Sequence, residues 1–296
     1  MSRIRLEPGS EPFPGLKLVQ ILGRGGFADV WEGVNAQGDR IAVKFMAHRH
    51  STTSVREMRI IQAIQKISHR NLLRIEQVIA IPDYIVIAME LADGSLFDLL
   101  ELYRNEYNSA LSAELTIGYL RQIASALDCI NARRHMFEGR QVGFQHCDVK
   151  PSNILLVGAV AKLADFGLST PTVALQSKYE RAGTLDFAAA EVHRGSLTDS
   201  SDQYSLAITY YYLRTATFPF PAVAQGFQRQ YSYNRPAPDL NAVSRGEQRA
   251  LERALDLEPT NRWPTCTALM THLSEAVKCS TPDPLDKDRD KRLSRV

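Results

Sequence analysis

Two aspartates in the middle of the sequence lie among residues that could carry out phosphoryl transfer. The segment His146-Cys-Asp-Val-Lys-Pro-Ser-Asn153 contains Asp148 and Lys150, and Asp165 begins an Asp-Phe-Gly sequence. Phosphoryl transfer needs a carboxylate that orients the attacking hydroxyl, oxygen ligands for Mg²⁺, and a cation near the developing charge. Asp148 suits the first role, Asn153 and Asp165 the second, and Lys150 the third. Each aspartate alone is more often a surface acid, so the prediction depends on the combination.

A second set of residues, near the N-terminus, could bind phosphate groups. The segment Gly23-Arg-Gly-Gly-Phe-Ala-Asp-Val30 lies between two predicted strands, and Lys44 ends a short apolar run. Glycine allows the backbone to approach anionic oxygens closely, and strands on both sides argue against the loops that lead from a strand into a helix. Glu57 is the only carboxylate between Lys44 and Gln65, so we expect it to hold the lysine. Taken alone, a hairpin turn and a solvated lysine explain these residues equally well.

The elements that must position these residues divide the chain into two parts. Alternating apolar residues predict strands at 16–21, 29–34, 40–46, 72–79 and 84–90, and helical periodicity predicts a helix at 54–66. Later segments predict helices at 95–103, 112–134, 200–215, 246–257 and 264–278. We therefore expect an α+β fold, with a small antiparallel sheet at 16–92 and a mainly helical part at 93–278. The segment 133–141 is expected to be a solvated surface loop.

In type and order, these motifs resemble the eukaryotic-type (Hanks-type) Ser/Thr protein kinase family over residues 16–278. His146-Cys-Asp148 stands at the His-Arg-Asp position, Asp165-Phe-Gly matches the metal-binding motif, and Ala189-Ala-Glu191 stands at Ala-Pro-Glu. The resemblance implies a bilobal kinase fold, with ATP and Mg²⁺ (or Mn²⁺) as cofactors. It also implies transfer of the γ-phosphoryl group to Ser/Thr hydroxyls of protein substrates, the chain itself included. The style of the motifs resembles that of bacterial members.

The resemblance also assigns individual residues. It places Thr184 with the catalytic residues Asp148, Lys150, Lys44 and Glu57, which favours Ser/Thr over Tyr substrates. The residues that it implies for ATP are Ile21, Leu22, Gly23, Arg24, Gly25, Gly26, Phe27, Ala28, Val30, Ala42, Lys44, Met89, Glu90, Leu91, Ala92 and Leu155. The structural residues that it implies are His146, Phe166, Gly167, Glu191, Asp202 and Arg262.

The resemblance makes three of these structural roles specific. Asp202 should hold the backbone of the catalytic loop. Glu191 and Arg262 should form a buried ion pair. His146 and Phe166 should stack with Ile61 in a column that links the two parts.

Two departures from the family pattern concern the site. Ala28 replaces the third glycine of the phosphate loop, which stiffens the loop without abolishing phosphate contact. Cys147 replaces the arginine that, in the family, binds a phosphate on the activation segment. Cysteine cannot do this, so we expect activity that is constitutive or set by another domain or partner.

The composition limits the other function classes. The 296 residues carry a formal net charge of +2, which is too small to indicate nucleic acid or a membrane surface as the main partner. Four cysteines without a regular spacing favour reduced thiols and a cytoplasmic location. Residues 1–15 are expected to be a lead-in, and 279–296 a charged, disordered tail. A pseudokinase and a small-molecule kinase remain as alternatives. The retained Lys44, Asp148 and Asp165 argue against the first, and the features at 189–191 and 202–262, which in the family shape a platform for protein substrates, argue against the second.

Overall fold

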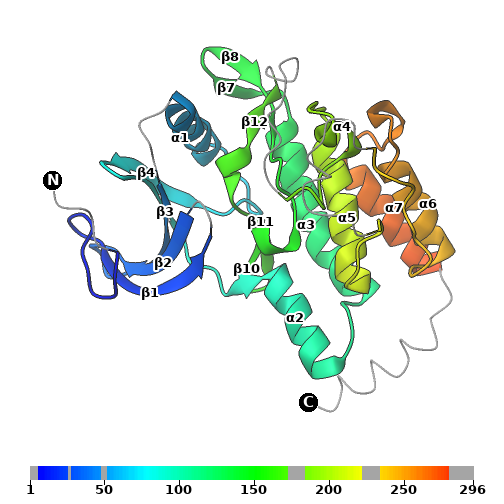
Figure 1. Cartoon of the computed structure of the whole chain (residues 1–296), viewed down its shortest axis with the longest axis horizontal. Coiled ribbons are helices and arrows are strands. Elements are labelled where there is room, and N and C mark those ends of the chain that lie inside the picture. Colours follow the sequence, from blue (N-terminus) through cyan, green and yellow to red (C-terminus); the bar gives the residue numbers. More distant parts are fainter. Residues whose placement is uncertain (1–5, 26–27, 48–51, 173–183, 222–233, 280–296) are drawn as a thin grey trace.

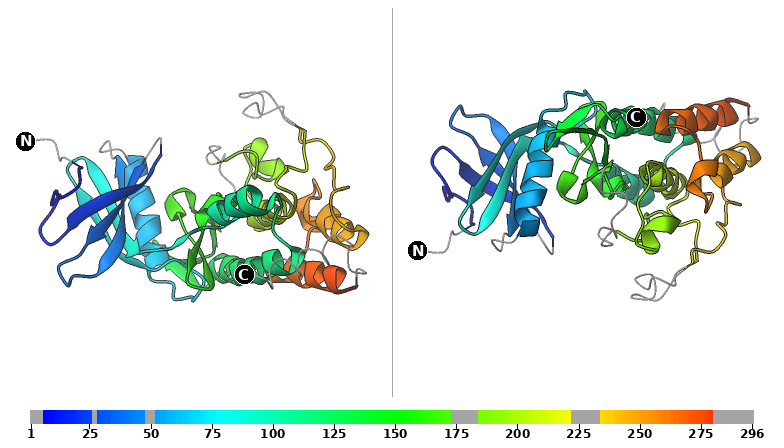
Figure 2. Two further views of the ribbon diagram at one scale, coloured as in Figure 1. Left: turned by 90° about the horizontal axis from the view of Figure 1, so that it is seen from below. Right: turned by 90° about the horizontal axis from the view of Figure 1, so that it is seen from above.

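We describe the computed structural model of this chain over residues 6–25, 28–47, 52–172, 184–221 and 234–279. A sheet with one helix against it precedes a mainly helical region, and Figure 1 shows the two side by side. In both views of Figure 2 the sheet lies at one end of the molecule and the longer helices lie at the other. This arrangement confirms the expected α+β fold.

The sheet has five antiparallel strands in the order β1-β2-β3-β5-β4. They are β1 (Lys17–Arg24), β2 (Ala28–Val34), β3 (Arg40–Ala47), β4 (Ile75–Ile81) and β5 (Tyr84–Glu90). Alternation along β3 sends Ile41, Val43 and Phe45 into a core that also contains Trp31. Ala42 and Lys44 therefore face the opposite side of the sheet, as the pattern predicts.

The helix α1 (Thr52–Gln65) packs on that opposite side. Its Ile61 is 1% exposed and belongs to a cluster with Val78, Ile85 and Ile87 of β4 and β5. α1 also contacts the short helix η2 (Phe166–Leu168), which follows Asp165. Through these contacts the sheet region reaches the segment that carries the second predicted aspartate.

The helical region is built around two long, buried helices. Its helices are α2 (Leu96–Tyr107), α3 (Ala113–Asn131), α4 (Ala190–His193), α5 (Ser201–Thr215), α6 (Arg245–Ala254) and α7 (Cys266–Cys279), with the short η1 (Pro151–Asn153) and η5 (Pro259–Asn261). Its strands are β6 (Gly94–Ser95), β7 (His135–Phe137), β8 (Arg140–Val142), β9 (Phe144–Gln145), β10 (Ile154–Val157), β11 (Val160–Leu163) and β12 (Thr170–Pro171). α3 and α5 contribute most of their length to one apolar core.

Serine side chains begin several of these helices. Ser95 caps α2 and Ser244 caps α6, each in a reciprocal capping box with an acid three residues later. Ser112 caps α3 by accepting a hydrogen bond from the backbone N–H of Leu115. The predicted starts of the helices at 95 and 112 therefore lie at the cap residue itself.

The structure corrects two predictions of local structure. The segment 133–141, expected to be a solvated loop, contains most of the β7–β8 hairpin, because Glu138 and Gly139 both adopt positive φ and Phe137 and Val142 are buried. The strand predicted at 72–79 begins only at Ile75. The backbone N–H of Leu73 instead donates to the carbonyl of Leu163, so the earlier residues join β11 and not the five-stranded sheet.

Within the part of the chain that the structure describes, no helix combines the length and the apolar character needed to span a bilayer. Parts of the predicted lead-in (1–5) and most of the predicted tail (280–296) lie outside the described residues.

Candidate active site

Three of the predicted residues surround the carboxylate of Asp148, which lies in the loop between β9 and β10. Asp148 Oδ2 accepts a hydrogen bond from Asn153 Nδ2 at 2.8 Å and lies 2.8 Å from Lys150 Nζ. Its Oδ1 accepts from the backbone N–H of Thr184 at 3.0 Å. Lys150 Nζ also donates to Thr184 Oγ1 at 2.6 Å. Asp148 is thus oriented on both oxygens, and residues 36 positions apart in the sequence meet at it.

The first turn of α5 holds the backbone of this loop. The Asp202 carboxylate accepts from the backbone N–H of His146 at 2.5 Å and of Cys147 at 2.9 Å, which confirms the expected contact. Burial raises the pKa of Asp202, and these two N–H donors oppose that rise. Cys147 needs this support because its φ of 69° lies in the left-handed region, which residues other than glycine seldom adopt. In addition, Gln145 Oε1 accepts from the backbone N–H of Asp202 at 3.2 Å, a contact that no sequence signal predicted.

Asp165 lies two residues after the end of β11, in a conformation that directs its carboxylate towards Lys44 on the sheet. Its φ of 64° is left-handed, and its Oδ1 lies 2.6 Å from Lys44 Nζ on β3. Burial tends to raise the pKa of Asp165, but the charge and hydrogen bond of Lys44 outweigh it and hold the pKa below its usual value. The carboxylate is therefore ionised at neutral pH, as a metal ligand must be.

Glu57 lies on α1 and is half-buried, and its relation to Lys44 differs from the expectation. Among the ion pairs between described residues, Lys44 contacts Asp165 and not Glu57. Burial raises the pKa of Glu57, and the positive charge of Lys44 opposes this shift. Lys44 is therefore near enough to Glu57 to lower the pKa of this carboxyl, but the ammonium of Lys44 is paired with Asp165.

The column of side chains between the two regions is formed in part. The rings of His146 and Phe166 meet edge to face with centroids 5.3 Å apart. His146 Nε2 also donates to the Ala164 carbonyl at 2.9 Å, which ties the catalytic loop to the residue before Asp165. Ile61 joins the cluster under the sheet, on the helix that contacts η2.

The described residues that the resemblance assigns to ATP lie on β1, β2, β3, β5 and β10, in the turn after β1, and directly after β5 at Leu91 and Ala92. The strand register places Val30 opposite Lys44 and Ala42 opposite Met89, so that these four share one face of the sheet. Leu155 on β10 pairs with Ser95, three residues after Ala92. Ile21 is partly buried, while Leu22, Gly23, Arg24 and Gly25 are exposed on β1 and the turn that follows it. Gly26 and Phe27 lie outside the described residues.

The side chain of Glu90 has a role that sequence reasoning missed. Only its backbone was expected to contact adenine, but its Oε1 lies 2.7 Å from Lys162 Nζ on β11 and accepts from the backbone N–H of Arg74 at 2.7 Å. The segment that joins the two regions is thereby attached to β11. No spacing in the sequence signals this pair, because its members are 72 residues apart.

The expected ion pair between Glu191 and Arg262 is confirmed. Their side chains are joined by two hydrogen bonds, at 2.9 and 2.6 Å, and are 6% and 0% exposed. Burial raises the pKa of Glu191, but the hydrogen bonds and charge of Arg262, together with Ser201, lower it below its ordinary value overall. The end of the segment that begins at Asp165 is thus fixed to the helical core.

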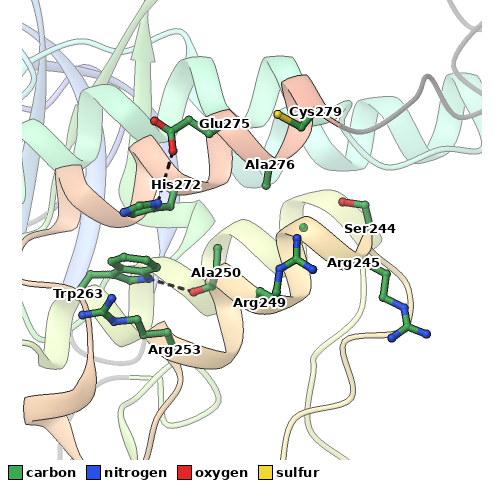
Figure 3. Close-up of a pocket in the computed structure, with 11 residues that line it drawn as sticks. Ser244, Arg245, Arg249, Ala250, Arg253, Trp263, His272, Glu275, Ala276 and Cys279 are labelled. Carbon is green, nitrogen blue, oxygen red and sulfur yellow. Dashed lines mark hydrogen bonds and ion pairs between the residues drawn. The ribbon is translucent and has the colours of Figure 1, made fainter.

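A cavity of about 760 Å³ lies elsewhere, between α6 and α7. Figure 3 shows Trp263 in this cavity, between Arg253 and His272. The guanidinium carbon of Arg253 lies 4.0 Å from the centroid of the Trp263 ring, and the centroid of the His272 ring lies 3.9 Å from it. Arg245 points away from Arg253 in this view. None of the predicted site residues lines this cavity, so it is separate from the candidate active site.

A carboxylate held in a loop, a second aspartate in Asp-Phe-Gly and a lysine on the facing sheet define a protein kinase. The chain belongs to that family: the protein kinase domain model matches residues 16–273.

Individual kinases of eukaryotes and bacteria are similar to it. A probable myosin light chain kinase of Dictyostelium discoideum is 28% identical over 82% of this chain and 62% of that protein. CBL-interacting protein kinase 4 of Oryza sativa subsp. japonica is 30% identical over 85% and 56%. The serine/threonine-protein kinase Pkn1 of Myxococcus xanthus is 29% identical over 88% and 38%. The chain thus spans less than two thirds of the length of these relatives.

Proposed function

We propose that this chain transfers the γ-phosphoryl group of ATP to Ser or Thr hydroxyls of protein substrates, itself included. The observation that carries the proposal is the arrangement around Asp148, whose two oxygens are oriented by Thr184, Asn153 and Lys150. A carboxylate fixed in this way can accept the proton of an attacking hydroxyl. Relatives named as Ser/Thr kinases support the substrate class.

The proposed reaction assigns a task to each residue of the cluster. Asp148 orients the substrate hydroxyl and accepts its proton as the oxygen attacks the γ-phosphorus. The bond from this phosphorus to the oxygen bridging to the β-phosphate breaks, and ADP leaves. Lys150 lies beside Asp148 and can neutralise charge on the transferred group. Lys44 binds the α- and β-phosphates, with Glu57 as its counter-ion. For this, the Lys44 ammonium must move away from Asp165, with which it is paired in this structure.

The residues present fit a hard divalent cation. Asn153 uses its Nδ2 to contact the carboxylate and the carbonyl of Asp148, which turns its Oδ1 away from them. Asp165 is ionised, because Lys44 holds its pKa below the usual value. It also lies close to Asn153, because the backbone N–H of the preceding residue, Ala164, donates to the Asn153 carbonyl at 2.9 Å. Carboxylate and amide oxygens are ligands that Mg²⁺ and Mn²⁺ accept. Asn153 and Asp165 would hold the ion, which when bound would supply positive charge to offset the charge of the phosphates.

The remaining assignments are also proposals. Adenine would lie between Val30, Ala42 and Leu155 and would pair with backbone groups at Glu90 and Ala92. The catalytic domain would span residues 16–278. A bacterial source, supported by relatives in Myxococcus xanthus and Lactococcus lactis, and a cytoplasmic location in signalling complete the proposal.

The test is a transfer assay with Mg²⁺, γ-labelled ATP and myelin basic protein, in which Lys44→Met and Asp148→Asn stand beside the unaltered protein. We expect label on Ser or Thr that Lys44→Met abolishes. Asp148→Asn should lower transfer roughly 10²–10⁴-fold because it removes the proton acceptor, while ATP binding, measured by calorimetry, persists.

The other outcomes are equally informative. Tight ATP binding without any transfer would favour a pseudokinase over an active enzyme. Loss of both binding and transfer in Asp148→Asn would show that the residue is structural, and unchanged turnover would remove its catalytic role.

A further inference from the structure

Arg235 is almost fully buried and contacts the turn that follows Thr184. Its Nη2 lies 2.8 Å from the carbonyl oxygen of Leu185, 2.8 Å from that of Asp186 and 3.0 Å from that of Ala188. A buried guanidinium needs acceptors, and backbone carbonyls without donors are costly to bury. The arginine and the turn therefore stabilise each other.

Aromatic rings and a histidine fix the position of this guanidinium. Its carbon lies 4.3 Å from the centroid of Phe220 and 5.8 Å from that of Tyr204 on α5. The same Nη2 lies 3.1 Å from Nε2 of the fully buried His193. Tyr204 also faces Arg262 at 4.8 Å, so the contacts of Arg235 continue into the ion pair with Glu191.

The turn held by Arg235 begins at the catalytic residues. The backbone N–H of Thr184 binds Asp148, and its hydroxyl binds Lys150. A protein whose hydroxyl reaches Asp148 must therefore pass beside residues 184–188. The position of these backbone atoms decides how such a chain is aligned with the carboxylate.

The turn is attached to the core by a second, independent contact. The ring of Phe187 packs edge to face on Tyr212 at 5.8 Å and on Phe218 at 5.1 Å. Removal of Arg235 is therefore expected to loosen the backbone of the turn while Phe187 keeps it near its place.

We infer that Arg235 is a positioning residue for the protein substrate: it fixes the backbone of residues 184–188, along which the substrate chain binds. The inference rests on the proposed kinase function. The residues assigned to ATP lie on the sheet and on β10, and none of the described contacts of Arg235 reaches them. Its loss should therefore affect the protein substrate and leave ATP unaffected.

The experiment compares Arg235→Lys and Arg235→Met with the unaltered protein, by steady-state kinetics in which myelin basic protein and ATP are varied in turn. Lysine keeps the charge but not the planar guanidinium that packs on Phe220 and whose Nη2 contacts the three carbonyls. We expect the KM for myelin basic protein to rise about tenfold in both variants, because misplacement of a binding surface by a fraction of an ångström is costly. The KM for ATP should stay within about twofold of the unaltered value.

The matched control is Arg249→Met, which removes an exposed arginine at the α6–α7 cavity, far from the turn in the fold, and should change neither KM. If Arg235→Met does not fold, the KM values of Arg235→Lys test the inference. Equal KM values for myelin basic protein in folded variants, or a parallel rise of both KM values, would overturn the inference alone. Absence of Lys44-dependent label in the unaltered protein would instead overturn the kinase proposal, and this inference with it.

Discussion

Glu191 and Arg262 show how a single buried pair couples the active-site segment to the core. Arg262 donates to both carboxylate oxygens and also to the carbonyls of Asp256 and Ser200, so four of its five N–H groups have acceptors within the protein. Removing one partner of such a pair leaves a charge buried without compensation, which is far more costly than the pair is worth. The stability that Glu191 provides should therefore depend both on substitution of this residue and on pH.

We expect Glu191→Gln to lower the free energy of unfolding by about 3 kcal/mol near neutral pH. The folded-state pKa of Glu191 lies below its ordinary value of 4.5. Its stabilising contribution is therefore fully present above about pH 4.5 and declines as the pH falls through the folded-state pKa. The difference between the two proteins should shrink over that acid range, as urea denaturation at several pH values would show.

A surface pair of similar geometry is the control. Glu101 and Arg104 lie 2.8 Å apart but are 37% and 48% exposed. Because water screens exposed charges, Glu101→Gln should cost about 0.5 kcal/mol or less. Equal losses in the two variants would contradict the argument from burial, and a difference that grew in acid would contradict the assigned direction of the pKa shift.

At the scale of the element, α5 acts through its first turn. The helix is buried along nearly its whole length, and it presents Asp202 to the backbone of the catalytic loop while Tyr204 faces Arg262 and Arg235. A helix anchored in the core moves little, so it can impose the strained conformation of Cys147. The geometry of the catalytic loop thus depends on an element some 55 residues further along the chain.

Asp202→Asn tests this dependence. An amide retains one acceptor but presents an NH₂ group to the other backbone N–H, so the loop should relax and turnover should fall about tenfold or more. Since the other residues of α5 remain packed in the apolar core, the substitution should leave the fold intact. Steady-state kinetics should show a lower kcat with an unchanged KM for ATP, and circular dichroism should show an intact fold.

Two results would contradict the role of Asp202. Unchanged turnover in the folded variant would show that the loop holds its conformation unaided. A rise in the ATP KM as large as the fall in kcat would place the effect in the sheet region.

At the scale of the whole molecule, Lys44 and Asp165 join the sheet region to the helical region. Their atoms are 2.6 Å apart across 121 residues of sequence. A nucleotide with its metal ion would engage both residues and so contact both regions at once. Binding should therefore stabilise the folded state of the entire domain by mass action.

We expect Mg²⁺ with a non-hydrolysable ATP analogue, at about 100 times its Kd, to add roughly 2.7 kcal/mol of stability and to raise Tm by about 5–10 °C. Asp165→Asn should lose the part of this rise that needs Mg²⁺, because a metal ligand is weakened. Asp83→Asn, at an exposed turn between β4 and β5, is the matched control and should keep the full rise. Differential scanning fluorimetry with and without Mg²⁺ measures both, and the same Mg²⁺-dependent rise in all three proteins would exclude Asp165 as a ligand.

The sequence by itself determined the features that depend on neighbours along the chain. Asp148 and Asn153 are five residues apart in one loop, so their contact could be predicted from spacing and chemical type. Ser95 and Ser112 begin helices because their hydroxyls bind N–H groups three residues later. Alternation along β3 likewise predicted which face carries Lys44, since side chains of a strand point to opposite sides in turn.

Only the tertiary structure decided the contacts between segments far apart in sequence. The pairing of Lys44 with Asp165, of Glu90 with Lys162, and of Arg235 with the turn after Thr184 carries no signal in spacing. Charges and hydrogen-bonding groups interact according to their distance in space and their burial. Both are set by how the sheet, α5 and the catalytic loop pack together, and local sequence does not encode that packing.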